Sequence, residues 1–250
     1  MRLWLRRHEK APTTQAGGKA KAADQLVSLI RGGREYREPF AGSGAVFFEV
    51  ARRSLFASYW LNDIDPGVTA FLTTLRDRPD ELAETIMAVR DEFRDEREAD
   101  QWARGLLCGT TDPFWLAVAQ YVVGRTSFSS QGRASSFSRT RVGERFSRSH
   151  VEKLPLFGEL LRGVQITCGD YEDVVSAPGD DVTLFLDPPY RIKTRNLYGE
   201  RGELHKSFQH DRFVEIAKST THRALITIDR THEAEFQAWH VWRRGRGLHE

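Results

Sequence analysis

The sequence predicts an α/β protein with an open, doubly wound sheet that is interrupted by an inserted, mainly helical segment. Short apolar segments alternate with segments of helical periodicity in both the first and the last third of the chain, which is the pattern of βαβ units. Residues 77–150 between them are charged and helical, and then irregular. We therefore expect a core made of residues 1–76 and 151–250, with residues 77–150 as the insertion.

The first part of the core is expected to hold two strand–turn–helix units. A leading helix ends at a glycine pair, and a strand then runs into a glycine-rich turn and a second helix. The next strand ends in acidic residues, and its helix starts at a proline, which is favoured in a first helical turn. The expected ranges are 20–30, 35–40, 45–53, 58–61 and 66–75.

The remaining elements complete this pattern. The insertion is expected to contain helices over 80–97, 100–107 and from 112 or 113 to 124, followed by an irregular segment. A loop of that length in a compact domain is usually functional or disordered. The second part of the core is expected to contain strands over 164–168, 182–186 and 224–228, with a helix over 211–219.

The composition is ordinary for a globular protein, with 40% hydrophobic and 29% charged residues and a net charge of +2. No apolar run approaches the roughly 20 residues that cross a bilayer, and no secretory signal is expected. Cys108 and Cys168 provide neither a disulfide framework nor ligands at zinc-site spacing. We therefore expect no membrane segment and no metal, and a reducing cytoplasm is the default location.

The stretch Asp187-Pro188-Pro189-Tyr190 follows the apolar segment 182–186 directly. It should lie at the carboxyl edge of the sheet, where α/β proteins bind ligands. The two prolines stiffen the backbone and carry no N–H, so the turn offers acceptors only, and Tyr190 adds an aromatic surface. This array suits a planar group that carries an amine, and we expect the four residues to be catalytic. A rigid turn that merely ends the strand is the alternative.

Residues 39–44, Pro-Phe-Ala-Gly-Ser-Gly, stand between a predicted strand and a predicted helix. Gly42 and Gly44 let a ligand approach the backbone and expose the N–H groups of the helix. A dinucleotide fingerprint would need a third glycine at Phe47, which argues against NAD or FAD. A simple tight turn is the alternative.

Acidic residues follow two of the other strands. Asp63 can accept hydrogen bonds from both ribose hydroxyls of a nucleoside cofactor, whereas Asp65, directly before Pro66, is suited to cap the helix. Asp170 is similarly placed for an adenine amine, with Tyr171 packing nearby. A helix cap is the alternative for Asp63 and for Asp170.

In this order, the motifs resemble those of the Dam-type, or D12-class, DNA adenine-N6 methyltransferases. The resemblance runs from Gly17 to about Trp239. It departs from the family pattern at Gln15, where the family often has an aromatic residue, and the chain is expected to end short of the family's final strand. The segments that carry the resemblance are 16–19, 39–44, 62–65, 169–171 and 187–190, with weaker matches at 207–210 and 225–229.

The resemblance implies a Rossmann-like, class I S-adenosylmethionine-dependent methyltransferase. Such an enzyme moves a methyl group to N6 of an adenine that is flipped out of double-stranded DNA. The insertion 77–150 would be the target-recognition region. The family serves restriction–modification systems, phages or bacterial genome marking, and a monomer is favoured. The implied cofactor contacts are Gln15, Lys19, Phe40, Gly42, Gly44, Asp63, Asp170, Tyr171 and Asp187.

The segment 125–148 is rich in arginine and serine, with phenylalanines between them. Arginine suits phosphate contacts and can read guanine, so we expect Arg125, Arg133, Arg139 and Arg141 to contact DNA. A solvated loop without a ligand is the alternative.

Two other functions stay open at this point. The acceptor could be another amine, such as cytosine N4 or an RNA base, because the acceptor array alone does not name the ring. The chain could also be a non-catalytic DNA-binding remnant of the fold, although Asp63 and Asp187 are both present.

Overall fold

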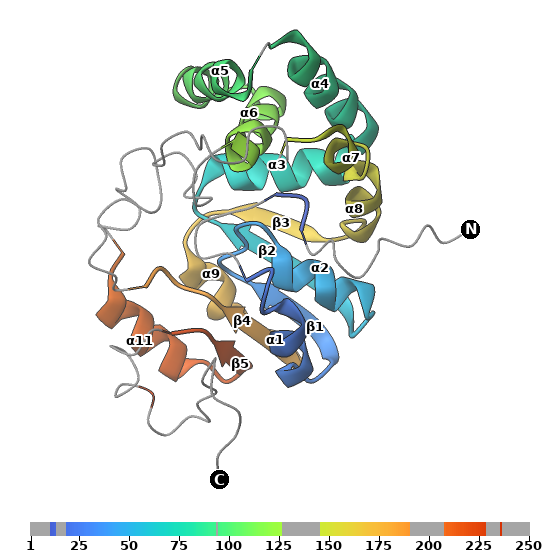
Figure 1. The fold of residues 1–250 in the computed structure, drawn as a ribbon. Helices are drawn as coiled ribbons and strands as arrows, with labels where there is room; N and C mark the ends of the chain where they lie inside the picture. The colour runs from blue at the N-terminus through green and yellow to red at the C-terminus, as the bar shows by residue number, and fades with distance from the viewer. Residues whose placement is uncertain are drawn as a thin grey trace.

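The computed structural model describes residues 11–13, 19–93, 95–126, 146–190, 208–228 and 236, and these contain one parallel sheet (Figure 1). The strand order within these ranges is β3-β2-β1-β4-β5. The chain builds outward from β1 in one direction and then from β4 in the other, as in doubly wound folds. The predicted α/β class with a parallel sheet is confirmed. The strands are β1 (Gly33–Glu38), β2 (Phe56–Asp63), β3 (Gln165–Cys168), β4 (Val182–Leu186) and β5 (Arg223–Ile226).

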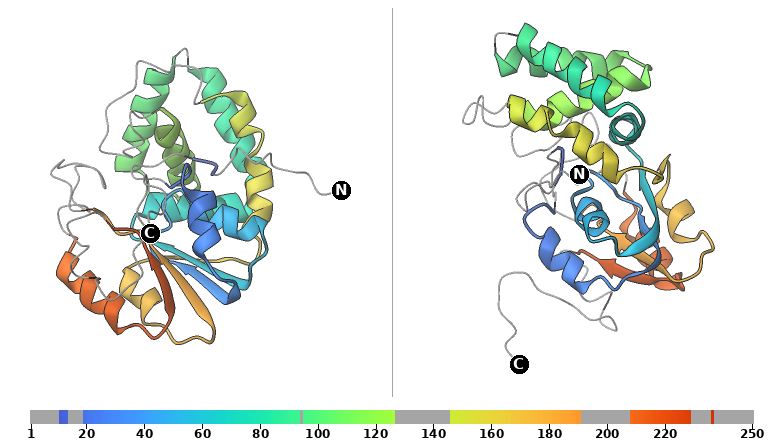
Figure 2. Two further views of the ribbon diagram at one scale, coloured as in Figure 1. Left: turned by 60° about the horizontal axis from the view of Figure 1, so that its bottom comes forward. Right: turned by 90° about the vertical axis from the view of Figure 1, so that its right-hand side faces the viewer.

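Both faces of the sheet are covered, as Figures 1 and 2 show. All five residues of β4 are buried, because alternate side chains of a strand point to opposite faces. Phe185 packs in one hydrophobic cluster with α1, α2 and α3, whereas Leu184 and Leu186 pack in a second cluster with α9 and α11. These helices are α1 (Ala23–Leu29), α2 (Ala45–Arg52), α3 (Pro66–Asp77), α9 (Tyr171–Val175) and α11 (His210–Ser219).

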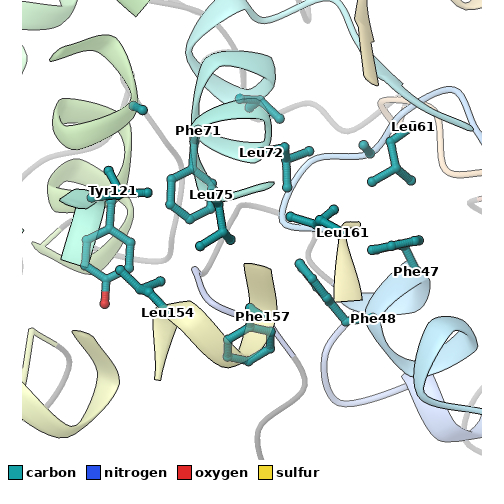
Figure 3. Packing of buried hydrophobic residues seen from close by; sticks show 14 of the residues in the cluster. Phe47, Phe48, Leu61, Phe71, Leu72, Leu75, Tyr121, Leu154, Phe157 and Leu161 are labelled. Atoms are coloured by element: carbon teal, nitrogen blue, oxygen red, sulfur yellow. The ribbon is translucent and has the colours of Figure 1, made fainter. Parts of the chain in front are cut away.

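Helices α4, α6 and α8 pack against α3, whereas α5 packs against α6 and α7 packs against α4 (Figures 1 and 2). Figure 3 shows Phe71 of α3 beside Tyr121 of α6, while Phe48 of α2 lies beside Phe157 of α8. Their ring centroids are 5.8 Å and 5.0 Å apart. One hydrophobic cluster therefore joins these helices to the sheet. The helices are α4 (Pro79–Glu92), α5 (Glu96–Gly109), α6 (Pro113–Thr126), α7 (Arg148–Val151) and α8 (Leu154–Leu160).

The first inserted helix ends earlier than the sequence predicts. A helix was expected to run to Arg97, but α4 ends at Glu92 and Phe93 is extended. The carboxylate of Asp95 accepts hydrogen bonds from the N–H groups of Arg97 and Glu98, both 2.9 Å long, and so starts α5. An N-cap residue in the middle of a charged stretch therefore divides the segment into two helices.

The helix α8 was not predicted from the sequence. Pro155 lies in its first turn, where proline is favoured, but Gly158 lies in its interior, where glycine is unfavourable. Packing explains the glycine. A Cβ atom at position 158 would lie 2.6 Å from the Leu75 carbonyl oxygen and 2.8 Å from Pro79. Gly158 thus lets α8 approach the junction of α3 and α4 closely, and tertiary contact outweighs local propensity here.

Candidate active site

A cavity opens at the carboxyl ends of the strands, beside the place where β1 and β4 lie next to each other. The loops that follow β1, β2, β3 and β4 all form part of its wall. Doubly wound sheets bind ligands at this point, because connections from neighbouring strands lead to opposite faces and leave a crevice. The predicted site residues that line the cavity are Lys19, Phe40, Gly42, Asp63, Asp170, Tyr171, Asp187 and Pro189.

The glycine turn adopts a backbone that only glycine enters readily. Gly42 has φ of 50° and Gly44 has φ of 67°, both in the left-handed region. At Gly44 a Cβ atom would also lie 2.9 Å from the ring of Phe48. Gly44 is the N-cap of α2. Because it has no side chain, it provides no capping hydrogen bond to the first turn of the helix. The turn thus presents the positive end of α2 toward the cavity.

Asp63 fastens the glycine turn to the end of β2. One carboxylate oxygen accepts the N–H of Gly42 at 2.8 Å, and the other accepts the N–H of Asp65 at 2.9 Å. Burial raises the pKa of Asp63 to about 7, although both N–H donors oppose the shift. The cap of α3 is Asp65, whose side chain accepts the N–H of Gly67. Asp65 therefore performs the capping role, which leaves Asp63 at the cavity wall.

Asp170 already has several hydrogen-bond donors. Its side chain caps α9 by accepting the N–H of Glu172 at 2.8 Å. Arg212 of α11 donates to both of its oxygens, at 2.8 Å and 3.2 Å. Burial alone would raise the pKa of Asp170, but Arg212 and the Glu172 N–H lower it below its ordinary value. Asp170 therefore caps a helix, which was the alternative role considered from the sequence, and it also lines the cavity.

Aromatic rings form one wall of the cavity. Phe40 from the turn after β1 stacks on Tyr171 at the start of α9, with ring centroids 5.1 Å apart and planes inclined by 29°. Phe208 lies 6.0 Å from Phe40 and 5.8 Å from Tyr171, measured between centroids. The guanidinium of Arg212 lies 5.3 Å from the centre of the Tyr171 ring. This wall is suited to hold a flat, apolar ring.

Asp187 lines the cavity, and Lys19 donates to it there. The Lys19 ammonium lies 2.6 Å from the carboxylate and 4.9 Å from the ring centre of Tyr190. The Tyr190 hydroxyl donates to Oδ1 of Asp187 over 3.3 Å. The hydroxyl of Thr227, the residue directly after β5, donates to the same oxygen atom. Burial alone would lower the pKa of Lys19, but Asp187 and Tyr190 raise it. Asp187 is therefore an acceptor of N–H groups that faces the cavity.

The two prolines of this turn differ in exposure. Pro189 lines the cavity, whereas Pro188 is buried and is not among the lining residues. The expected roles of Pro188, Pro189 and Tyr190 as a stiff turn and an aromatic surface stay predictions. Their position directly after β4, next to β1, agrees with the place that the sequence indicates.

Glu38, the last residue of β1, also lines the cavity and was missed from the sequence. It is 2% exposed and accepts a 2.8 Å hydrogen bond from the hydroxyl of Tyr36. Burial raises the pKa of Glu38 to about 8; the Tyr36 hydroxyl opposes this shift and the charge of Asp187 adds to it. The one available signal was an acid at the carboxyl end of a predicted strand, directly before the glycine turn.

Other predicted residues do not reach this site or fall outside the described ranges. The expectation that Arg125 contacts DNA is corrected, because Arg125 is 7% exposed, donates to the Pro12 carbonyl and lies against the Tyr121 ring. It ties the end of α6 to residues near the N-terminus. Gln15 of the cofactor set and Arg133, Arg139 and Arg141 of the DNA-binding set lie outside the described residues.

Within the described ranges, no group of three or more His, Cys, Asp or Glu side chains is arranged to hold a metal ion. Nor does any helix in these ranges have the length and apolar character needed to cross a membrane.

Comparison with known proteins places these features in a family context. The model of the D12 class N6 adenine-specific DNA methyltransferases matches residues 16–241. A Type II methyltransferase, M.MjaIII, of Methanocaldococcus jannaschii is 25% identical over 70% of this chain and 67% of its own length. The DNA adenine methylase of Escherichia coli K12 is 24% identical over 87% of this chain and 79% of its own length. The DNA N-6-adenine-methyltransferase of Escherichia phage P1 is 25% identical, and the match covers 70% of this chain but 23% of the phage protein.

Proposed function

The chain belongs to the D12 class of N6 adenine-specific DNA methyltransferases, and on this premise we propose that it transfers a methyl group from S-adenosylmethionine to N6 of adenine in double-stranded DNA. The observation that carries the proposal is the Asp187 carboxylate, which faces the cavity and accepts an ammonium N–H from Lys19 at 2.6 Å. An amine of a bound base would find the same acceptor.

Asp187 has a specific task in this reaction. The lone pair of an exocyclic amine is delocalised into its ring, and acceptors on its two hydrogens favour the pyramidal nitrogen that can attack. The nitrogen becomes positively charged as its bond to the methyl carbon forms, and a nearby carboxylate stabilises that charge. The nitrogen then loses a proton, while the electrons of the broken carbon–sulfur bond stay on sulfur. Tyr190 would stack on the base, and the Pro188 carbonyl would be the second acceptor.

The cavity residues fit a nucleoside cofactor with a charged tail. S-adenosylmethionine, when bound, supplies an electrophilic methyl group on a sulfonium. Asp63 would accept ribose hydroxyls, since each of its oxygens has lone pairs beyond the one that its backbone N–H uses. Phe40 and Tyr171 would pack on the adenine, and Asp170 would accept from its amine. Lys19 would hold the carboxylate of the methionine part, and Gly42 and Gly44 would let the ligand approach the backbone.

We also propose how the DNA is engaged. The insertion of residues 77–150 would be the target-recognition region, and Arg133, Arg139 and Arg141 would contact the DNA. Arg125 is not proposed as a DNA contact, because it is buried. The target adenine must leave the duplex stack, at a cost of roughly a few kcal/mol. The enzyme would act as a monomer in the cytoplasm of a bacterium, or of the host cell if a phage encodes it.

The test is transfer of a labelled methyl group from S-adenosylmethionine to duplex DNA by the full chain. We expect transfer by the wild type and a loss of about 100-fold or more in Asp187→Asn, in line with the removal of one transition-state contact. Asp180→Asn is the matched control, because Asp180 lies in an exposed ion pair with Arg34. Wild-type activity in Asp187→Asn would refute the assigned mechanism.

The same experiment separates the two alternatives. Nucleoside analysis of the product distinguishes N6-methyladenine from N4-methylcytosine, and RNA is offered as a second substrate. A non-catalytic remnant would leave every nucleic acid unlabelled, and calorimetry would then show whether the cavity still binds S-adenosylmethionine.

A further inference from the structure

The cavity carries more acidic than basic groups. Its lining includes the carboxyl groups of Glu38, Asp63, Asp65, Asp170 and Asp187, together with the cations Lys19 and Arg212. Both cations already contact an acid, since Lys19 lies against Asp187 and Arg212 lies against Asp170. The site therefore has an excess of acidic groups available to a positively charged ligand.

The described contacts of Glu38 include no ion pair, and the same holds for Asp63, whose carboxylate accepts the N–H groups of Gly42 and Asp65. The neighbours of Glu38 are the hydroxyl of Tyr36, 2.8 Å away, and the backbone N–H of Phe47 in the first turn of α2. The charges that act on it are those of Asp187, which opposes its ionisation, and of Lys19, which favours it. A carboxyl group that is 2% exposed pays a large desolvation cost when it ionises. These surroundings favour the neutral acid until another positive charge arrives.

Glu38 also lies where that charge must go. The strands β1 and β4 pair up to Arg37 and Leu184, so Glu38 and Asp187 leave neighbouring strands at the same edge of the sheet. Methyl transfer needs the sulfonium close to the amine that Asp187 holds, because reacting atoms must approach to about 3–3.5 Å. A bound sulfonium would thus lie in the same small region as the Glu38 carboxyl group.

We propose that Glu38 is the residue that distinguishes the positively charged methyl donor from its neutral thioether product. The inference rests on the proposed function. The Glu38 carboxyl releases a proton to solvent when the sulfonium binds, and it takes up a proton when the reaction turns sulfur into a neutral thioether. The methylated nitrogen loses one proton in the same reaction, so charge and protons balance. The product is then held less tightly than the donor and leaves the site. The raised pKa of Glu38, about 8, agrees with a neutral acid in the ligand-free protein near pH 7.

Calorimetry tests the inference without turnover. S-adenosylmethionine and S-adenosylhomocysteine are titrated at pH 7 into the wild type, Glu38→Gln and Glu49→Gln, each in phosphate and in Tris, whose ionisation enthalpies differ. Both ligands carry the same ribose and adenine, so protons exchanged by Asp63 cancel in the difference between them. Glu49 is the control, because its carboxylate pairs with Arg52 and Arg53 at the end of α2.

We expect the wild type and Glu49→Gln to release a proton with S-adenosylmethionine that they do not release with S-adenosylhomocysteine. Glu38→Gln should lose this difference, and its preference for the sulfonium should fall by roughly tenfold, since an opposite charge shifts a carboxyl pKa by about 1 to 3 units. If Glu38→Gln keeps both the difference and the preference, the inference is overturned while the proposed function stands. If the wild type binds neither ligand, the proposed cofactor is wrong.

A second variant decides the matter even if Glu38→Gln does not fold. The Tyr36 hydroxyl lowers the pKa of Glu38, so Tyr36→Phe should raise it. In the wild type, the preference for the sulfonium should rise with pH and level off above about pH 8, where Glu38 ionises without ligand. Tyr36→Phe should move that plateau to higher pH. The groups near Glu38 that could also contribute are Lys19, Asp63 and Asp187, and an unmoved plateau would assign the effect to them and overturn the inference.

Discussion

Replacing Glu38 by glutamine should change how the free energy of unfolding depends on pH. Burial raises the pKa of Glu38 from 4.5 to about 8. Between these values the folded protein keeps a proton that the unfolded chain has lost. The folded state therefore binds more protons than the unfolded state, and the contribution of this group to stability falls as the pH rises from about 5 to about 8.

The size of the effect follows from the shift. One pKa unit corresponds to about 1.4 kcal/mol, so the wild type should lose roughly 3 kcal/mol relative to Glu38→Gln between pH 5 and pH 8. Glutamine has nearly the same shape as protonated glutamate and can still accept from Tyr36, so little packing changes. Asp63 titrates in both proteins, and its contribution cancels when the two are compared.

Urea unfolding followed by circular dichroism at pH 5, 6, 7 and 8 measures this difference. Glu49→Gln shows how much a Glu-to-Gln change outside the cavity alters the same measurement. The advantage of Glu38→Gln over the wild type should grow steadily with pH. A difference that stays constant over the whole range would mean that Glu38 does not hold the proton, and the reasoning about its burial would be refuted.

Three further variants test the packing around the site by urea unfolding. Arg37→Met should lower the unfolding free energy by about 3 kcal/mol, because Arg37 is 2% exposed and pairs with Glu35; an unchanged value would contradict a structural role for this pair. Gly44→Ala should lower the unfolding free energy by about 1–2 kcal/mol, because Gly44 has a positive φ of 67°. Gly105→Ala is the control, since a Cβ atom there would meet no other atom within 4 Å, and it should raise the unfolding free energy by roughly 0.5–1 kcal/mol. Leu75→Ala should cost about 2–5 kcal/mol, since Leu75 is fully buried between the sheet and the inserted helices; a loss under about 1 kcal/mol would argue against a shared core.

The sequence predicted the sheet and the main site elements because their signals are local. A continuous apolar strand followed by Asp187 and two prolines marks the edge of a buried parallel sheet wherever the segment ends up. The same holds for the glycine turn with Gly42 and Gly44, where positive φ values leave few alternatives. The sequence left two roles open for Asp63 and for Asp170, since an acid after a strand can cap a helix or bind a ligand. Capping is observed for Asp170 and, beside Asp63, for Asp65.

The features that the sequence did not predict depend on distant contacts. Arg125 looked like a DNA contact because it begins a basic segment, but its guanidinium is buried against residues more than a hundred positions away in sequence. The helix α8 was not predicted, and the close approach of its Gly158 to Leu75 joins parts of the chain that are far apart in sequence. Neither contact leaves a pattern within the segment itself.

Taken alone, the sequence determined which chemical groups stand at strand ends and in which order, because strand periodicity, glycine turns and proline turns act over a few residues. Only the tertiary structure decided which of these groups meet. Lys19 and Asp187 are 168 positions apart in the sequence but form a hydrogen bond in the structure. Glu38 lines the same cavity because β1 and β4 are neighbours at the point where the sheet reverses its order. The physical reason is that desolvation and charge coupling depend on distance in space, which the local pattern of a chain does not record.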